Sequence, residues 1–337
     1  MIRIPDKSRL FAFILGLVML LASGCHNDEK SRLKLESMKN DPQATKYAIR
    51  LAEMSYLTGR KPDKTYAYTL IRNFIKDGYF TEARYAIDHL VDLYGPDADM
   101  YYLEAVCFRN QHEYKQALTF IGEALKLENS NGLFEMEKSN IVEEQRKWNE
   151  IDSLNTLVGK HESNYGLRLE RSQKLLGMRE FEAAIFDADT VLRADSTNLQ
   201  ARFVKGISFL LDGKYDKALP EFEILVARTT APDYEDYTFY YGIAQRLVDN
   251  ADQLKKNPLS PAPYINVARA LARISEYTNA LITLDKGLSK IPDNNNLLYA
   301  KALVFLQKGD KNAARDLVYI LEGKGVNVDP AVKKAVE

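Results

Sequence analysis

The sequence repeats with a period of about 34 residues over most of its length, and this period constrains the fold more than any other feature. Similar strings recur at residues 78–83 (GYFTEA) and 213–218 (GKYDKA), and at 113–117 (EYKQA) and 276–280 (EYTNA). Aligned on their alanine, seven units begin at residues 64, 98, 132, 165, 199, 261 and 295. A chain of this kind is expected to stack similar units side by side rather than to fold around a single core.

Four positions of the repeat hold one kind of side chain in nearly every unit. Position eight is mostly small: Ile71, Ala105, Ser139, Ser172, Gly206, Ala268 and Ala302. Position twenty is mostly alanine: Ala83, Ala117, Ile151, Ala184, Ala218, Ala280 and Ala314. Position eleven is apolar and position seventeen is mostly aromatic. Small residues let two helices approach closely, so each unit is predicted to form two amphipathic helices of about 12–14 residues.

The repeat fails at residues 233–260, where five aromatic residues lie within eight positions: Tyr234, Tyr237, Phe239, Tyr240 and Tyr241. A single helix is predicted from about 234 to 256, ended by Asn257-Pro258. Two interpretations stay open. The aromatic residues pack the core of a degenerate repeat, or a bend presents them to a partner.

The two ends of the repeat array are irregular. Residues 25–63 are predicted to be a tether and a degenerate leading helix pair, with Pro42 at a first helical position. At the other end, Pro330 begins a short capping helix within residues 329–337, with Val332 and Val336 turned inward. Solenoids need such ends because a terminal unit has no neighbour to cover it.

The period and its small, aromatic and alanine columns resemble those of the tetratricopeptide repeat family. The resemblance covers residues 64–328 apart from 233–260, and the unit at 132–164 departs from it most, with Ile151 in the alanine column. It implies an all-α, right-handed α-solenoid of about seven to nine helix pairs, and a role in binding other proteins.

The N-terminus is predicted to be a lipoprotein signal. Three basic residues precede the apolar run 10–22, which is shorter than the ~20 residues of a membrane span and suits a secretory signal. The next residues, Ala22-Ser23-Gly24-Cys25, resemble the lipobox of bacterial lipoproteins. The resemblance implies cleavage of residues 1–24 and attachment of acyl chains, palmitate among them, at Cys25. An ordinary signal peptide or an anchor helix is the alternative.

The residue after this cysteine is His26 rather than Asp. By the same resemblance, this favours a lipid-anchored protein of the outer membrane, either facing the periplasm or exposed at the surface.

The composition and motifs favour no catalytic, metal or nucleic-acid chemistry. Lys and Arg number 46 against 47 Asp and Glu, so the chain lacks the basic excess that nucleic acid requires. The four histidines are scattered, no phosphate-binding loop or nucleophile elbow is present, and Cys107 is expected to be a buried structural thiol. We therefore expect no enzyme activity, no cofactor and no bound metal.

The resemblance also suggests where a partner binds. In that family the first helix of each unit lines the concave face, through repeat positions that include five and nine. Position five is apolar or aromatic throughout: Tyr68, Tyr102, Met136, Leu169, Phe203, Ile265 and Tyr299, with Phe239 in the irregular unit. Position nine adds Arg72 and Arg269. Members that bind chaperone tails clamp a carboxylate with Lys at five and Asn at nine, and only Asn140 matches here.

These residues predict a groove for an extended peptide or an amphipathic helix held by hydrophobic side chains. The alternative is that tight winding buries position five between neighbouring helices. The function predicted is a scaffold or adaptor in an envelope assembly, secretion or motility complex. There are two alternatives to a scaffold. The irregular unit hides a glycan-binding or enzymatic site, or the chain is a passive spacer.

Overall fold

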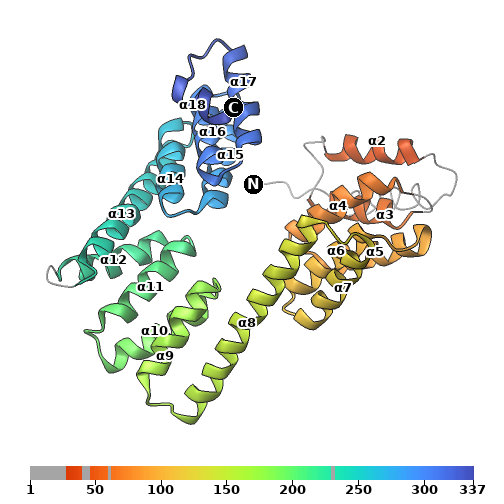
Figure 1. Cartoon of the computed structure of the whole chain (residues 1–337). Helices are drawn as coiled ribbons and strands as arrows, with labels where there is room; N and C mark the ends of the chain where they lie inside the picture. The colour runs from red at the N-terminus through yellow and green to blue at the C-terminus, as the bar shows by residue number, and fades with distance from the viewer. Residues whose placement is uncertain (1–27, 40–45, 60–61, 229–231) are drawn as a thin grey trace, which may run out of the picture. The chain divides into compact units, whose positions relative to one another are not determined.

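The computed structural model describes residues 28–39, 46–59, 62–228 and 232–337. These residues form 17 helices and no strand, which confirms the all-α prediction (Figure 1). None of the described helices is both long and apolar enough to cross a membrane. The predicted signal peptide, Cys25 and Pro42 lie outside the described residues. The chain divides into two compact units, residues 1–149 and 150–337, called unit 1 and unit 2 below.

In unit 1, helices α2 to α7 each pack against the next, α3 also touches α5 and α4 touches α6, and Phe134 and Ile141 of α8 join core residues of α6 and α7. The helices of this unit are α2 (Asp28–Lys39), α3 (Lys46–Leu57), α4 (Lys64–Lys76), α5 (Phe80–Tyr94), α6 (Ala98–Asn110), α7 (Tyr114–Leu127) and the first part of α8 (Gly132–Lys160). Its core holds fully buried Phe74, Leu90 and Met100 in one cluster and Ile121 and Phe134 in a second. The predicted leading pair corresponds to α2 and α3.

In unit 2, helices α9 to α18 each pack against the next, and α14 also touches α16. After the rest of α8 come α9 (Tyr165–Gly177), α10 (Phe181–Ala194), α11 (Leu199–Leu211), α12 (Tyr215–Val226), α13 (Tyr234–Lys256), α14 (Pro261–Arg273), α15 (Tyr277–Lys290), α16 (Asn295–Lys308), α17 (Lys311–Gly323) and α18 (Pro330–Val336). Contacts between consecutive helices are what a solenoid requires, because each repeat buries its apolar face only against its neighbours.

The repeat columns explain how the helices pack. Every residue at position twenty is at most 1% exposed, including the exceptional Ile151. Gly206 at position eight is needed for close approach, since a Cβ atom there would lie 3.1 Å from the ring of Phe222. The Asp and Asn residues that end the units cap the next helix. The side chain of Asn198, for example, accepts a hydrogen bond from the backbone N–H of Ala201 at 2.9 Å and so satisfies a donor that the first turn of α11 leaves free.

Residues 132–164 depart from the prediction, because they form the single 29-residue helix α8 instead of a helix pair. In six other units position fifteen takes a positive φ and turns the chain: Gly78, His112, Arg179, Gly213, Ser275 and Gly309. The equivalent Arg146 stays helical. There, Glu143 pairs with Arg146 at 2.8 Å and with Lys147 at 3.5 Å, spacings that stabilise a continuous helix.

The irregular unit follows its prediction closely. Helix α13 spans Tyr234–Lys256 and ends before Pro258. Tyr237 is 2% exposed and packs against Phe203, with ring centroids 5.3 Å apart, and Tyr240 stacks on Phe222. Tyr237 thus packs the core, whereas Tyr234, Phe239, Tyr240 and Tyr241 are half-buried, so each of the two interpretations holds for part of this unit.

A short helix, α18, lies at the position predicted for a capping helix. Helix α18 begins at Pro330, and Val336 is buried against α17 with Val332 partly covered beside it. Helix α18 therefore covers apolar residues of α16 and α17.

One contact in unit 2 joins residues far apart in sequence. Arg179, in the turn between α9 and α10, forms a bidentate ion pair with Glu276, in the turn between α14 and α15. The two nitrogen–oxygen distances are 2.7 and 3.2 Å. The turns of two helix pairs that are 97 residues apart therefore lie side by side.

Candidate functional site

In unit 1 the position-five residues range from buried to exposed. Tyr68 is 8% exposed and donates its hydroxyl to Asp97, and its burial together with this hydrogen bond raises the pKa of the phenol. Tyr102 is half-buried and stacks on Phe134, with ring centroids 5.3 Å apart. Met136 is 56% exposed on α8. The stripe is thus neither wholly solvated nor wholly buried.

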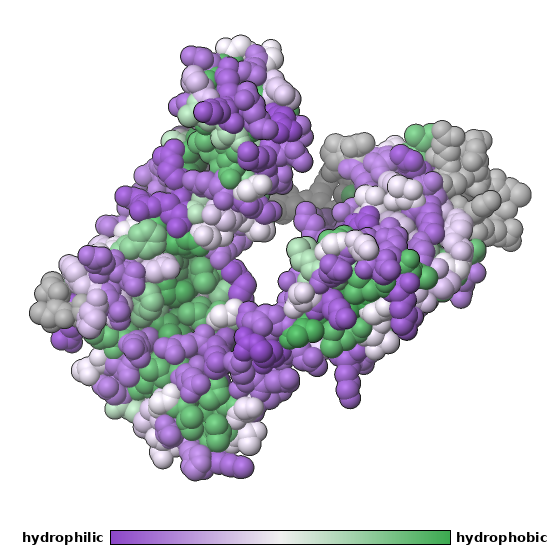
Figure 2. Space-filling model, viewed as in Figure 1, coloured by the Kyte–Doolittle hydropathy of each residue, from purple (hydrophilic) through white to green (hydrophobic). Residues whose placement is uncertain are grey.

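In unit 2 all of the position-five residues are half-buried: Leu169, Phe203, Phe239, Ile265 and Tyr299. Phe203 contacts Tyr237 and Tyr240, with ring centroids 5.3 and 5.5 Å apart, so part of this ring belongs to the core. Figure 2 shows hydrophobic surface over α11 to α13, the helices that carry Phe203 and Phe239. Apolar side chains in this part of unit 2 therefore remain accessible at the surface.

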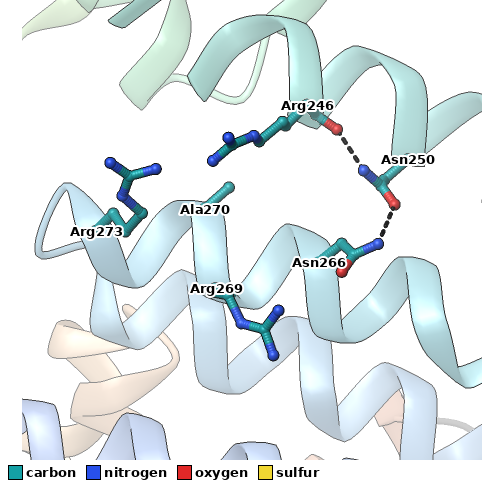
Figure 3. A pocket seen from close by; sticks show the side chains of 6 residues that line it. All are labelled: Arg246, Asn250, Asn266, Arg269, Ala270 and Arg273. Carbon is teal, nitrogen blue, oxygen red and sulfur yellow. Dashed lines mark hydrogen bonds between the residues drawn. The ribbon is translucent and has the colours of Figure 1, made fainter. Parts of the chain in front are cut away.

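The two predicted arginines have different surroundings. Arg72 is exposed, lies 3.7 Å from Asp99 and sits over the ring of Tyr68. Arg269 lines a cavity of about 380 Å³ between α13 and α14. The remaining lining residues are Arg246, Asn250, Asn266, Ala270 and Arg273 (Figure 3).

The floor of this cavity is held by two asparagines. Asn250, which is 7% exposed, donates to the backbone carbonyl of Arg246 at 2.7 Å and accepts from the side chain of Asn266 at 3.1 Å. This bridge ties α13 to α14. Arg273 extends over the ring of Phe239, 5.1 Å from its centroid, which links the cavity to the position-five stripe.

The sequence analysis missed Arg246 and Arg273 because neither occupies a position it assigned to the groove. The spacing of these residues in the sequence did contain a signal for them. Arg269 and Arg273 are four residues apart and so share a face of one helix, and Arg246 follows Phe239 by seven residues, two helical turns. Only the packing of α13 against α14 brings the two faces together.

Unit 1 contains a larger cleft, of about 750 Å³, among α3, α4 and α5. Its walls include Met54 and Phe74, together with Arg50, which stacks over Tyr79 and pairs with Asp77 at 2.9 Å. Arg50 is therefore already paired within the protein, whereas Lys46, which also lines the cleft, has no ion pair among the described residues.

The described residues contain no cluster of three or more His, Cys, Asp or Glu side chains suited to a metal ion. Cys107 is fully buried, and burial raises the pKa of its thiol to about 12, so it is unsuited to act as a nucleophile. Glu104, one turn earlier, is 5% exposed and lies 3.2 Å from Arg84. Burial raises the pKa of its carboxyl to about 7.

A tetratricopeptide repeat family model matches residues 169–235, from within α9 to the first residues of α13. No curated protein matches the sequence.

Several solved structures resemble the chain. A tetratricopeptide repeat protein from Parabacteroides merdae is 15% identical, with 79% of this chain and 94% of that one covered and a TM-score of 0.27. YrrB, described as having an unusual peptide-binding site, is 14% identical, with coverages of 55% and 97% and a TM-score of 0.28. PilW, described as a widely conserved type IV pilus biogenesis factor, is 15% identical, with coverages of 71% and 98% and a TM-score of 0.24.

The family match falls on helices whose small and alanine columns are buried as the repeat requires. Residues 169–235 thus carry the tetratricopeptide repeat signature, within a chain whose described residues form consecutively packed helices.

Proposed function

We propose that this chain is a non-enzymatic scaffold that binds a partner protein along the first helices of its repeats. The occupant proposed is an extended peptide or an amphipathic helix with apolar side chains. The observation that carries the proposal is the position-five stripe, where Met136 is 56% exposed and the unit 2 members remain half-exposed. A passive spacer would have no reason to keep apolar side chains there.

An enzymatic or glycan-binding site in the irregular unit has less support. Tyr237 belongs to the core and Phe239, Tyr240 and Tyr241 pack partly against it, and the cavity beside them is lined by arginine, asparagine and alanine without a carboxylate among the described residues. General acid–base chemistry on a sugar would need two carboxyl groups.

Site-specific photo-crosslinking separates these possibilities. A photoreactive amino acid replaces Met136 in one variant and Val142 in a control, since both are about half exposed on α8 but only Met136 lies on the stripe. We expect covalent capture of a partner in intact cells from position 136 and not from position 142. Equal capture from both positions, or from neither, would contradict the proposed binding surface.

We further propose that the scaffold is anchored to the outer membrane through a lipid on Cys25, within an envelope assembly, secretion or motility complex. The support is the sequence of the signal region alone. Cys25→Ser should release the protein from washed membranes, because a lipid chain stabilises membrane binding by about 0.8 kcal/mol per buried CH₂ group. A variant that stays bound after alkaline washing would overturn the lipid anchor while leaving the scaffold proposal intact.

A further inference from the structure

The cavity between α13 and α14 concentrates positive charge that the protein does not neutralise. Arg246, Arg269 and Arg273 line it with exposed side chains, and none of them forms an ion pair with an acidic side chain that the structure describes. Other arginines of the chain lie against carboxylates, as Arg202 does with Glu221 at 2.8 Å. In a protein with a formal net charge of −1, unpaired guanidinium groups gathered at one cavity create a local positive potential that favours an anion.

The orientation of the side chains strengthens this point. Figure 3 shows Arg246 on α13 and Arg273 on α14 directing their guanidinium groups toward one another across the cavity, above Ala270, whereas Arg269 turns to the other side of α14. Two like charges that face each other repel, and an anion between them removes the repulsion. The small side chain of Ala270 leaves space for an anion between the two guanidinium groups.

Unit 2 itself contains the arrangement that such a pair of arginines favours. Asp187 lies between Arg171, which it binds through both oxygens at 2.6 and 2.7 Å, and Arg168 at 3.5 Å. One carboxylate thus satisfies two guanidinium groups, a geometry in which the planar fork of arginine matches the two oxygens. At the cavity between α13 and α14 the arginines are present and the carboxylate is missing among the described residues.

We propose that this cavity binds the carboxylate side chains of an acidic segment of the partner protein, through Arg246 and Arg273 with Arg269 alongside. The inference rests on the proposed scaffold function and adds the chemistry of the partner. A protein segment fits better than a small anion because apolar residues of the stripe lie next to the cavity. Arg273 lies over Phe239, and Ile265 precedes Arg269 by one turn on α14.

A ligand that crosses this region would thus place apolar side chains at Phe239 and Ile265 and acidic ones at the arginines. The contribution of the arginines is electrostatic, so it weakens as added salt shortens the Debye length.

The test uses the full chain in detergent and two synthetic amphipathic peptides. They share an apolar face of leucine and differ only in carrying glutamate or glutamine on the polar face. Calorimetry or fluorescence anisotropy at low salt should show at least about tenfold tighter binding of the glutamate peptide, equal to about 1.4 kcal/mol.

Two double variants complete the experiment. Arg246→Gln with Arg273→Gln should abolish the preference for glutamate. Arg193→Gln with Lys286→Gln, which removes the same charge from exposed positions on α10 and α15, should retain it. Circular dichroism of each variant checks that the helices remain.

Equal binding of the two peptides by the unaltered chain overturns the inference, as does an unchanged preference in the cavity variant. Inorganic phosphate and phosphatidylglycerol vesicles serve as competing anions. If either binds through the same arginines while the glutamate peptide does not, the ligand is not a protein segment and the inference is wrong. None of these results depends on crosslinking at Met136, so failure of the inference is distinguishable from failure of the scaffold.

Discussion

Residues 132–164 and 165–198 occupy consecutive repeats, yet the first forms one helix and the second forms a helix pair. Both have serine at position eight and arginine at position fifteen. Arg179 adopts a left-handed φ of 63° and turns the chain, whereas Arg146 continues α8. The residue at the turn therefore does not decide between the two structures.

The difference lies in what each segment gains by folding back. In the second repeat, Ser172 donates to the carbonyl of Ala184 at 2.8 Å, and Asp187 binds Arg171 across the pair. These contacts offset the ~1–2 kcal/mol cost of a left-handed residue other than glycine. In the first repeat, Lys138 and Leu154 stand where Arg171 and Asp187 would be, so no such ion pair can form.

The largest effect is expected from Asp187→Ala. This carboxylate is 1% exposed and holds two arginines, so its removal leaves their charges partly buried and unpaired. We expect the free energy of unfolding to fall by about 3–5 kcal/mol, measured by denaturant titration with circular dichroism. Asp189→Ala is the control, because the more exposed Asp189–Lys205 pair should contribute less than about 1 kcal/mol. Similar losses in both variants would refute this account of the helix pair.

A smaller effect on the free energy of unfolding is expected from the charge state of Glu104, the buried carboxyl of unit 1. Glu104 has one arginine partner, Arg84, whereas Asp187 has two. The folded-state pKa of Glu104 is about 7, above its ordinary 4.5, so the folded chain binds this proton more tightly than the unfolded chain. Stability from this group is present at low pH and is lost as the pH rises from about 4.5 to 7, by about 3 kcal/mol.

Fluorescence of Trp148, the chain's single tryptophan, reports on unit 1 during urea titrations at different pH values. Glu104→Gln should flatten the pH profile, because a neutral amide has no proton to lose. A variant with the same pH dependence as the unaltered chain would show that other groups cause it.

The smallest effect on stability is expected from replacing the two serines at position eight, Ser139 and Ser172. Ser172→Ala removes a buried hydrogen bond and leaves the carbonyl of Ala184 without this donor, so a loss of about 1 kcal/mol is expected. Ser139 is exposed and donates only within its own helix, to the carbonyl of Glu135. Ser139→Ala should therefore be neutral or slightly stabilising, because alanine has the higher helix propensity. Thermal unfolding of both variants measures the difference, and equal shifts would contradict it.

The sequence was sufficient to predict the parts of the fold that depend on local pattern. The alanine column, the Asn198 cap, the bounds of α13 and the capping helix at Pro330 all follow from residue type and spacing. The single helix α8 could not be predicted in this way, because Arg146 and Arg179 are the same residue at the same repeat position.

The candidate site was predicted only in part, for a related reason. Position five could be identified from the repeat, but how much of Tyr68 or Met136 is exposed depends on the neighbouring helices. The pairing of Arg246 with Arg273 depends on the irregular helix α13, which has no counterpart in the repeat pattern. Cys25 lies outside the described residues and stays a prediction.

The ion pair between Arg179 and Glu276 has a consequence for how unit 2 responds to force or local melting. In a simple array each repeat contacts only its neighbours. Local unfolding therefore spreads from one repeat to the next, and distant repeats influence each other only through those between them. The contact between these two turns adds a second connection in parallel, directly from α9–α10 to α14–α15. While this ion pair holds, the helices between the two turns can open only within a closed loop, but Arg179 is 52% exposed, so the pair protects the middle of unit 2 by no more than about 1 kcal/mol.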